Sequence, residues 1–261
     1  MRPVASLVHS RTRVRPRYAL LPLEGFPDSR LPTWPGARVR VLASPALGAG
    51  FVQYLIDLPA GGRGGFPADG RGDGRGTETF CYVLSGSGTL AGGSGDYGGR
   101  HPLAAGAFAL LPPGDAVAVS AAPDAGLSLL VLRKRYEPAA GVEPFAAVFG
   151  HEADVPRQVW ADNPHSLLQT LVPDELGFDL AMNIFTFSPG FGLPVVETHV
   201  MEHGLYFLQG KGVYYLGDDW MEVEQDDFVW MGPYCPQSFY ATGPVPSRYL
   251  YYKNVNREIE V

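Results

Sequence analysis

The sequence repeats itself, and this internal repeat constrains the fold more than any other feature. Four segments of the first half recur in the same order about 120 residues later. The clearest pair is TETFCYVLSGSGTL and EHGLYFLQGKGVYYL, in which four positions are identical, namely Glu78 and Glu202, Tyr82 and Tyr206, Gly86 and Gly210, and Gly88 and Gly212. A repeat of this kind means that one structural unit is built twice, so we predict an internal duplication.

Each repeated segment has the pattern of short β-strands separated by tight turns. In GFVQYLIDL, successive side chains alternate between two faces, and the 33 glycines and 24 prolines supply turns and interrupt helices. Each copy is therefore expected to be a small antiparallel barrel, which predicts an all-β chain of two tandem barrels. We expect an irregular N-terminal arm over 1–40, barrels over 41–137 and 176–261, and a connector over 138–175 with one short helix near residues 174–176.

Composition excludes several classes of protein. The formal net charge of -7 is a poor match for nucleic acid, whose phosphates require a basic surface. No apolar run reaches the roughly 18 residues of a membrane span, so no membrane partner is expected. The two cysteines, Cys81 and Cys235, stand apart from any CxxC pair and are predicted to be buried thiols. With no signal-peptide core at the N-terminus, the expected location is cytoplasmic.

Two of the six histidines stand four residues apart, in ETHVMEHGLYFLQG. The spacing Glu197-x-His199-x3-His203-x6-Gly210 resembles the first motif of the cupins, with the outer ligand types exchanged. Residues two apart on a strand share a face, so Glu197 and His199 point the same way, and His203 has the same parity. In the second cupin motif the position of the usual histidine is Gln237. This mixed nitrogen and oxygen set suits a divalent ion such as manganese or iron.

The first copy serves as an internal control for this interpretation. At the four matching positions it has Asp73, Arg75, Thr79 and Val117. An arginine and a valine cannot hold a divalent cation. We therefore predict that the N-terminal barrel is metal-free and has a structural or oligomeric role, and that only the C-terminal barrel is catalytic.

The last predicted strand contributes further candidates. Tyr249, Tyr251 and Lys253 alternate and so share a face. A lysine that points into a barrel needs an anion, and Lys253 is expected to hold a substrate carboxylate. Lys134 aligns with Lys253 in the first copy, which leaves open an inherited structural role. Tyr214 is a candidate hydrogen-bond donor to a ligand, although an ordinary barrel tyrosine fits the pattern nearly as well.

At ETHVMEHGLYFLQGKGVYYL, PYCPQ and YLYYKN the chain resembles the (S)-ureidoglycine aminohydrolases more closely than cupins in general. The resemblance implies a bicupin, with two jelly-roll barrels, each a double-stranded β-helix. It also implies a homo-oligomeric enzyme that uses Mn²⁺ to release ammonia from (S)-ureidoglycine, a small carboxylate with a ureido group, in purine and allantoin catabolism. The residues it implies are Glu197, His199, His203 and Gln237 as metal ligands, Tyr214, Tyr249 and Lys253 as substrate contacts, and Tyr249 and Lys253 as catalytic groups.

Two alternatives come from other functional classes. An iron-dependent cupin dioxygenase also uses a mixed nitrogen and oxygen site with open positions. Gln237 argues against it, because cupin dioxygenases usually keep a third histidine. A non-enzymatic bicupin that binds a small ligand is the second alternative, and the intact set of four candidate ligands argues against that one.

Overall fold

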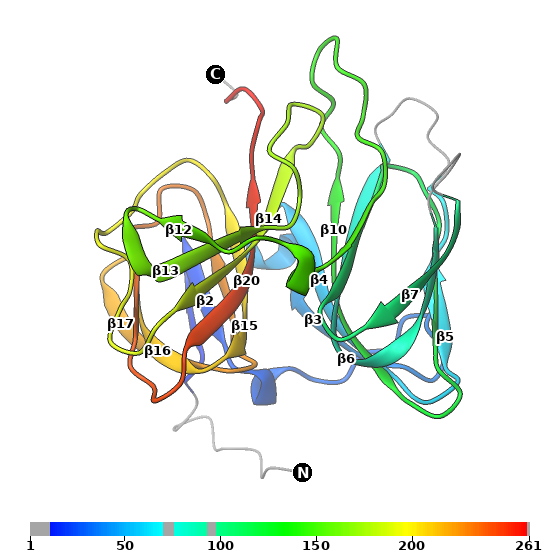
Figure 1. Cartoon of the computed structure of the whole chain (residues 1–261), viewed down its shortest axis with the longest axis horizontal. Helices are drawn as coiled ribbons and strands as arrows, with labels where there is room; N and C mark the ends of the chain where they lie inside the picture. Colours follow the sequence, from blue (N-terminus) through cyan, green and yellow to red (C-terminus); the bar gives the residue numbers. More distant parts are fainter. Residues whose placement is uncertain (1–10, 70–75, 93–97, 260–261) are drawn as a thin grey trace. The chain divides into compact units, whose positions relative to one another are not determined.

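The computed structural model describes residues 11–69, 76–92 and 98–259, and this part of the chain is built from antiparallel strands (Figure 1). No α-helix occurs among these residues, which confirms the all-β prediction, and the helical turns are the 3-10 turns Leu23–Gly25, Pro45–Leu47 and Glu152–Asp154. The short helix expected near residues 174–176 is wrong. That segment has a single backbone hydrogen bond of the turn type, from Phe178 to Glu175 at 2.9 Å, which is too little for a helix.

The described chain divides into two compact units. The C-terminal unit consists of residues 11–27, 156–171 and 180–255. Its eight-stranded sheet has the order β1-β2-β18-β15-β20-β14-β13-β12, and a three-stranded sheet has the order β17-β16-β19. Apolar side chains from both sheets form one core, so the sheets pack face to face. The strands are β1 (Arg13–Arg15), β2 (Tyr18–Leu21), β12 (Gln158–Trp160), β13 (Asn163–Thr170), β14 (Leu180–Phe187), β15 (His203–Gln209), β16 (Lys211–Leu216), β17 (Asp219–Glu224), β18 (Phe228–Met231), β19 (Gln237–Ala241) and β20 (Ser247–Asn254).

The N-terminal unit consists of the described residues within 28–155, 172–179 and 256–259. Its nine-stranded sheet contains the path β11-β8-β6-β10-β4-β3, and β9 pairs with both β5 and β6 while β7 pairs with β6. The strands are β3 (Arg38–Ala43), β4 (Phe51–Leu58), β5 (Arg63–Phe66), β6 (Thr77–Gly92), β7 (Gly99–Ala104), β8 (Ala107–Leu111), β9 (Val117–Ala121), β10 (Leu127–Arg135) and β11 (Val148–His151).

The same strand order recurs in the two units. In the N-terminal unit the order is β4-β10-β6-β8, and in the C-terminal unit β14-β20-β15-β18 follows the same path. At the tight turn in the middle of each copy, Gly86 and Gly210 have φ values of 84° and 79°. A side chain is strained in this left-handed region, which explains glycine at both positions.

The segment expected to be an irregular arm contains regular structure. β2 pairs with β18 through the register Tyr18 to Met231, so it extends the sheet of the C-terminal unit. Tyr18, Ala19 and Leu20 are buried there, and Arg11 pairs with the buried carboxylate of Asp227. The prolines that flank this segment exclude a helix, but the four residues of β2 are enough for a strand between β1 and β18.

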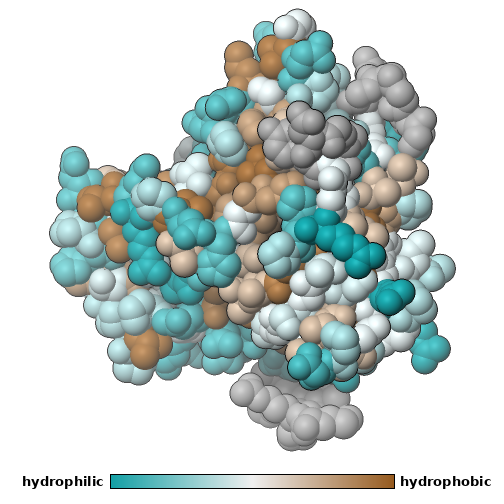
Figure 2. All heavy atoms as spheres, turned by 45° about the vertical axis from the view of Figure 1, so that its right-hand side comes forward, coloured by the Kyte–Doolittle hydropathy of each residue, from teal (hydrophilic) through white to brown (hydrophobic). Residues whose placement is uncertain are grey.

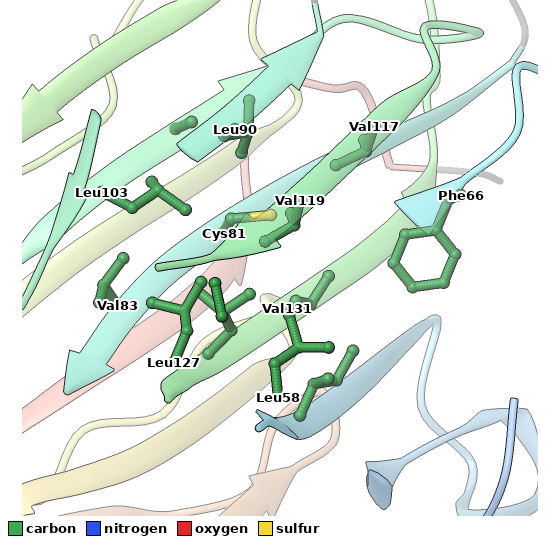
Figure 3. Close-up of a cluster of buried hydrophobic side chains, with 14 of the residues drawn as sticks. Leu58, Phe66, Cys81, Val83, Leu90, Leu103, Val117, Val119, Leu127 and Val131 are labelled. Carbon is green, nitrogen blue, oxygen red and sulfur yellow. The ribbon is translucent and has the colours of Figure 1, made fainter. Parts of the chain in front are cut away.

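The interior of the N-terminal unit is packed with apolar side chains. Figure 3 shows part of the cluster, in which Phe66 from β5, Val119 from β9 and Val131 from β10 belong to the same core as Cys81 from β6. Cys81 and Cys235 are both free and buried, which confirms the sequence prediction for them.

The exposed surface mixes polar and apolar residues, as the interspersed teal and brown spheres of Figure 2 show. Large apolar side chains that remain exposed include Trp220 and Val195, at 59% and 58%. Within the described residues, no helix has both the length and the apolar character needed to cross a membrane.

Candidate functional site

Strand pairing brings the predicted residues of the C-terminal unit together. His203 is the first residue of β15, and its partner across the ladder is Lys253 on β20. Gln237 is the first residue of β19, and two backbone hydrogen bonds of 2.8 and 2.9 Å join it to Glu197. Directly paired residues of an antiparallel ladder point to the same face, so the sheets place these four side chains around one space.

That space is a cavity of about 150 Å³ inside the C-terminal unit. Every residue that the sequence analysis assigned to the site lines it, namely Glu197, His199, His203, Tyr214, Gln237, Tyr249 and Lys253. The sequence analysis missed five further lining residues, which are Trp160, Phe185, Leu193, Leu205 and Tyr251. The alternation of β20 placed Tyr251 on this face without assigning it a role. Trp160 lies in the predicted connector, where no sequence pattern pointed to a site.

The two histidines are held close together in a dry environment. Their rings stack with centroids 4.7 Å apart and planes at 26°. Burial first, and then the charges of His199 and Lys253, lower the pKa of His203 to about 3. Burial and the charge of Lys253 also lower the pKa of His199. Both imidazoles are therefore neutral at pH 7, the state in which a ring nitrogen can bind a metal ion.

Glu197 faces the same group of charges. Burial raises the pKa of its carboxyl group, and the nearby ammonium of Lys253 partly offsets this increase. A bound cation would favour the ionised carboxylate further. Lys253 thus acts electrostatically on three of the four candidate ligands.

The amide of Gln237 bridges the histidines and a buried tyrosine. Its Oε1 accepts a hydrogen bond of 2.7 Å from the Tyr214 hydroxyl, and its Nε2 lies 3.5 Å from Nε2 of His199. Burial first, and then the charge of Glu197, raise the pKa of Tyr214 well above the ordinary tyrosine value. Tyr214 therefore keeps its proton and acts as a hydrogen-bond donor.

The donor types suit a divalent metal ion, since two neutral imidazoles, a carboxylate and an amide line one cavity. Among the described residues, however, no three His, Cys, Asp or Glu side chains gather closely enough to hold an ion. A rotation of the Gln237 amide by 180° would exchange its oxygen and nitrogen and turn the oxygen toward the histidines. The residues thus fit a metal by their chemistry, and side-chain rotation has to complete the site.

The alignment of Lys134 with Lys253 is wrong by one position. On the paired strands, Thr79 faces Arg133 in the N-terminal unit as His203 faces Lys253 in the C-terminal unit. The equivalent of Lys253 is therefore Arg133. A shift of one residue moves a side chain to the other face of a strand, so Lys134 points away from the interior that Arg133 faces. Of the positions that match the ligands, Asp73 and Arg75 lie outside the described residues.

The chain is similar to proteins of known function. No protein-family model matches the chain. The chain is 34% identical over 247 residues to the (S)-ureidoglycine aminohydrolase of Escherichia coli, covering 94% of this chain and 90% of the relative. This chain belongs to the (S)-ureidoglycine aminohydrolase family. An Arabidopsis thaliana member is 32% identical, covering 92% of this chain and 76% of the relative.

Solved structures agree on the fold of the family. The crystal structure of the E. coli protein Ylba superposes with a TM-score of 0.84 at 33% identity, covering 98% of each chain. A cupin 2 conserved barrel protein from Leptotrichia buccalis superposes with a TM-score of 0.58 at 15% identity, covering 87% of this chain and 92% of the other. The second likeness shows the cupin fold alone. As a family member, the chain is an enzyme that acts on C–N bonds.

Proposed function

We propose that this chain hydrolyses (S)-ureidoglycine, releasing ammonia and forming (S)-ureidoglycolate in purine breakdown through allantoin. Membership of the family supports the reaction. The structural observation that carries the proposal is the pairing of His203 with Lys253 across β15 and β20. This pairing directs two groups into the same cavity, namely the Lys253 ammonium, which can bind a carboxylate, and the neutral imidazole of His203.

We propose further that Glu197, His199, His203 and Gln237 hold Mn²⁺. When bound, such an ion supplies Lewis acidity and lowers the pKa of a coordinated water molecule. The neutral state of both histidines supports this assignment, because their ring nitrogens keep a free lone pair. Glu197 supplies the one negative charge among the four ligands.

Lys253 binds the substrate carboxylate in this proposal. Its side chain is half-buried at the cavity, where a charge-assisted hydrogen bond is stronger than in water. Holding the carboxylate fixes the position of the neighbouring α-carbon, at which the C–N bond breaks and the new C–O bond forms. Binding of the carboxylate therefore also orients the reacting atoms.

Tyr249 acts as a hydrogen-bond donor and not as a base. Burial first, and then the neighbouring hydroxyls of Tyr214 and Tyr251, raise its pKa well above the ordinary value. It is 2% exposed and lines the cavity. A protonated phenol in this place can stabilise the polar ureido group, and the aromatic walls of Phe185 and Trp160 limit access of bulk water.

The finer features of the architecture belong to the same proposal. We propose that the two units are jelly-roll barrels that arose by internal duplication, because their strands follow the same order. The N-terminal unit is metal-free in this view, and the enzyme is a cytoplasmic homo-oligomer. Thr79 and Val117 at the positions of His203 and Gln237 support the loss of metal ligands.

Ammonia release from ureidoglycine, generated in situ from allantoate by a separate amidohydrolase, tests the reaction. We expect acceleration over spontaneous decay with Mn²⁺, no acceleration after chelation, and (S)-ureidoglycolate as the product. Lys211→Met is a matched control, because Lys211 is an exposed lysine of the same unit, and it should behave as the wild type. A metal-loaded protein that gives only the spontaneous rate would contradict the reaction, and oxygen uptake would then test the dioxygenase alternative.

A further inference from the structure

The buried hydroxyl groups beside Gln237 form a chain of hydrogen bonds. Tyr249 donates to the Tyr214 oxygen, and Tyr214 donates to Oε1 of Gln237 over 2.7 Å. All three side chains are at most 4% exposed, so water does not compete for these hydrogen bonds. The rings of Tyr214 and Tyr249 also contact Phe239, which restricts their movement.

These hydrogen bonds determine which end of the Gln237 amide faces His199. While Tyr214 donates to Oε1, the amide nitrogen lies toward His199, at 3.5 Å from its Nε2. An amide nitrogen has no lone pair available for a metal ion, whereas the amide oxygen has two. The direction of one tyrosine hydroxyl is thus coupled to the ability of Gln237 to act as a ligand.

We infer that Tyr214, supported by Tyr249, is a positioning residue that sets the orientation of the Gln237 amide, with the direction of their hydrogen bonds reversing when the site is loaded. In the loaded orientation Nε2 of Gln237 donates to the Tyr214 oxygen, and the Tyr214 hydroxyl donates to the Tyr249 oxygen. Both hydrogen bonds of this network are kept with their directions exchanged, and the Tyr249 hydroxyl then turns its proton toward the cavity that it lines. This inference rests on the proposed metal site.

The backbone around Gln237 leaves the amide as the part that rotates. Two backbone hydrogen bonds with Glu197 fix the main chain, and β19 begins at this residue. Rotation about the last side-chain bond is therefore enough to switch between the two orientations, and no strand has to move.

Titration calorimetry with Mn²⁺ on the full chain tests the inference. We expect Tyr214→Phe to weaken Mn²⁺ binding by about tenfold, the scale of losses at residues that orient metal ligands. Tyr249→Phe should have a smaller effect because it acts through Tyr214. Tyr215→Phe is the matched control, since Tyr215 stacks on Trp220 on the other face of β16 and should bind as the wild type. Thermal unfolding with chelator checks that the metal-free variants fold alike.

A second background separates orientation from a general loss of packing. In Gln237→Glu, both terminal atoms of the side chain are oxygens, so either orientation presents an oxygen to the metal. In this background we expect Tyr214→Phe to change Mn²⁺ affinity by less than about twofold. Equal losses in both backgrounds, or no loss in either, would overturn the inference. A wild-type protein that binds no Mn²⁺ would instead overturn the proposed metal site itself.

Discussion

The two units share a strand order but differ in what fills them. In the C-terminal unit, His203 and Lys253 face a cavity, whereas Thr79 and Arg133 occupy the same paired positions in the N-terminal unit. There Arg133 donates a hydrogen bond of 3.3 Å to Thr79, and its guanidinium lies 4.2 Å from the centre of the Phe66 ring. A few inward positions therefore decide whether this strand order surrounds a polar cavity or a packed interior.

Both units have a cationic side chain at this paired position, but the partners of Arg133 and Lys253 differ. Arg133 is satisfied by a hydroxyl and an aromatic face within its own unit. Lys253 lines a cavity that can admit an anion from solution. The chemistry of an inward position thus depends on which polar groups the neighbouring strands place beside it. The following substitutions test this difference between the two units.

The largest effect is expected from giving the C-terminal unit the residues of the N-terminal unit. His203→Thr with Gln237→Val copies Thr79 and Val117 into the site. Each change removes a proposed ligand, so the pair should weaken Mn²⁺ binding by more than ~100-fold, the loss that removal of a ligand-orienting residue alone can reach, and ammonia release should fall to the spontaneous rate. Calorimetry and the ammonia assay measure this. Retention of tight Mn²⁺ binding would show that other residues hold the metal.

The next largest effect is a loss of stability on substitution of Lys134, which does not face the cavity. Lys134 is 5% exposed and pairs with Asp179, which is fully buried. Lys134→Met removes the cation that contacts the buried Asp179 carboxylate, and should reduce the free energy of unfolding by about 3–5 kcal/mol. Urea denaturation measures the loss. A change below about 1 kcal/mol would mean that the pair contributes no more than a surface ion pair.

The same substitution at Lys253 should weaken substrate binding and leave the stability of the fold unchanged. We expect Lys253→Met to raise KM by about tenfold to a hundredfold, the value of one hydrogen bond between charged groups. Urea denaturation should remain close to wild type, and Mn²⁺ binding should not weaken, because the change removes a cation beside the candidate ligands. Steady-state kinetics decides the matter, and an unchanged KM would remove Lys253 from the substrate site.

The smallest effect is a pH dependence that belongs to the N-terminal unit. Burial first, and then the charge of Asp179, raise the pKa of Glu78 well above 4.5. Because the folded state holds the proton more tightly, Glu78 contributes stability at low pH that is lost as the pH rises above 4.5. Glu78→Gln should therefore gain stability relative to wild type between pH 5 and pH 8, by at most ~1.4 kcal/mol per pH unit. A pH-independent difference in urea denaturation would contradict this.

The sequence was sufficient to predict the all-β class and the seven assigned residues of the cavity, because both follow from strand periodicity and motif spacing. It could not place Trp160, because β12 joins the sheet only through β13, which in turn pairs with β14. It also placed Lys134 on the wrong face. The alignment matched lysine with lysine, and residue types alone could not show that Arg133 is the residue that pairs with Thr79 as Lys253 pairs with His203.

The pairing of β2 with β18 has a consequence for biosynthesis. β2 (Tyr18–Leu21) leaves the ribosome early, but its partner β18 (Phe228–Met231) is made only after all the strands of the N-terminal unit. The long separation makes this contact slow to form, so β2 can pair only with the adjacent β1 while the intervening chain folds. The N-terminal unit can thus complete its own core first, and the unit that carries the cavity closes its sheet only when synthesis is nearly finished.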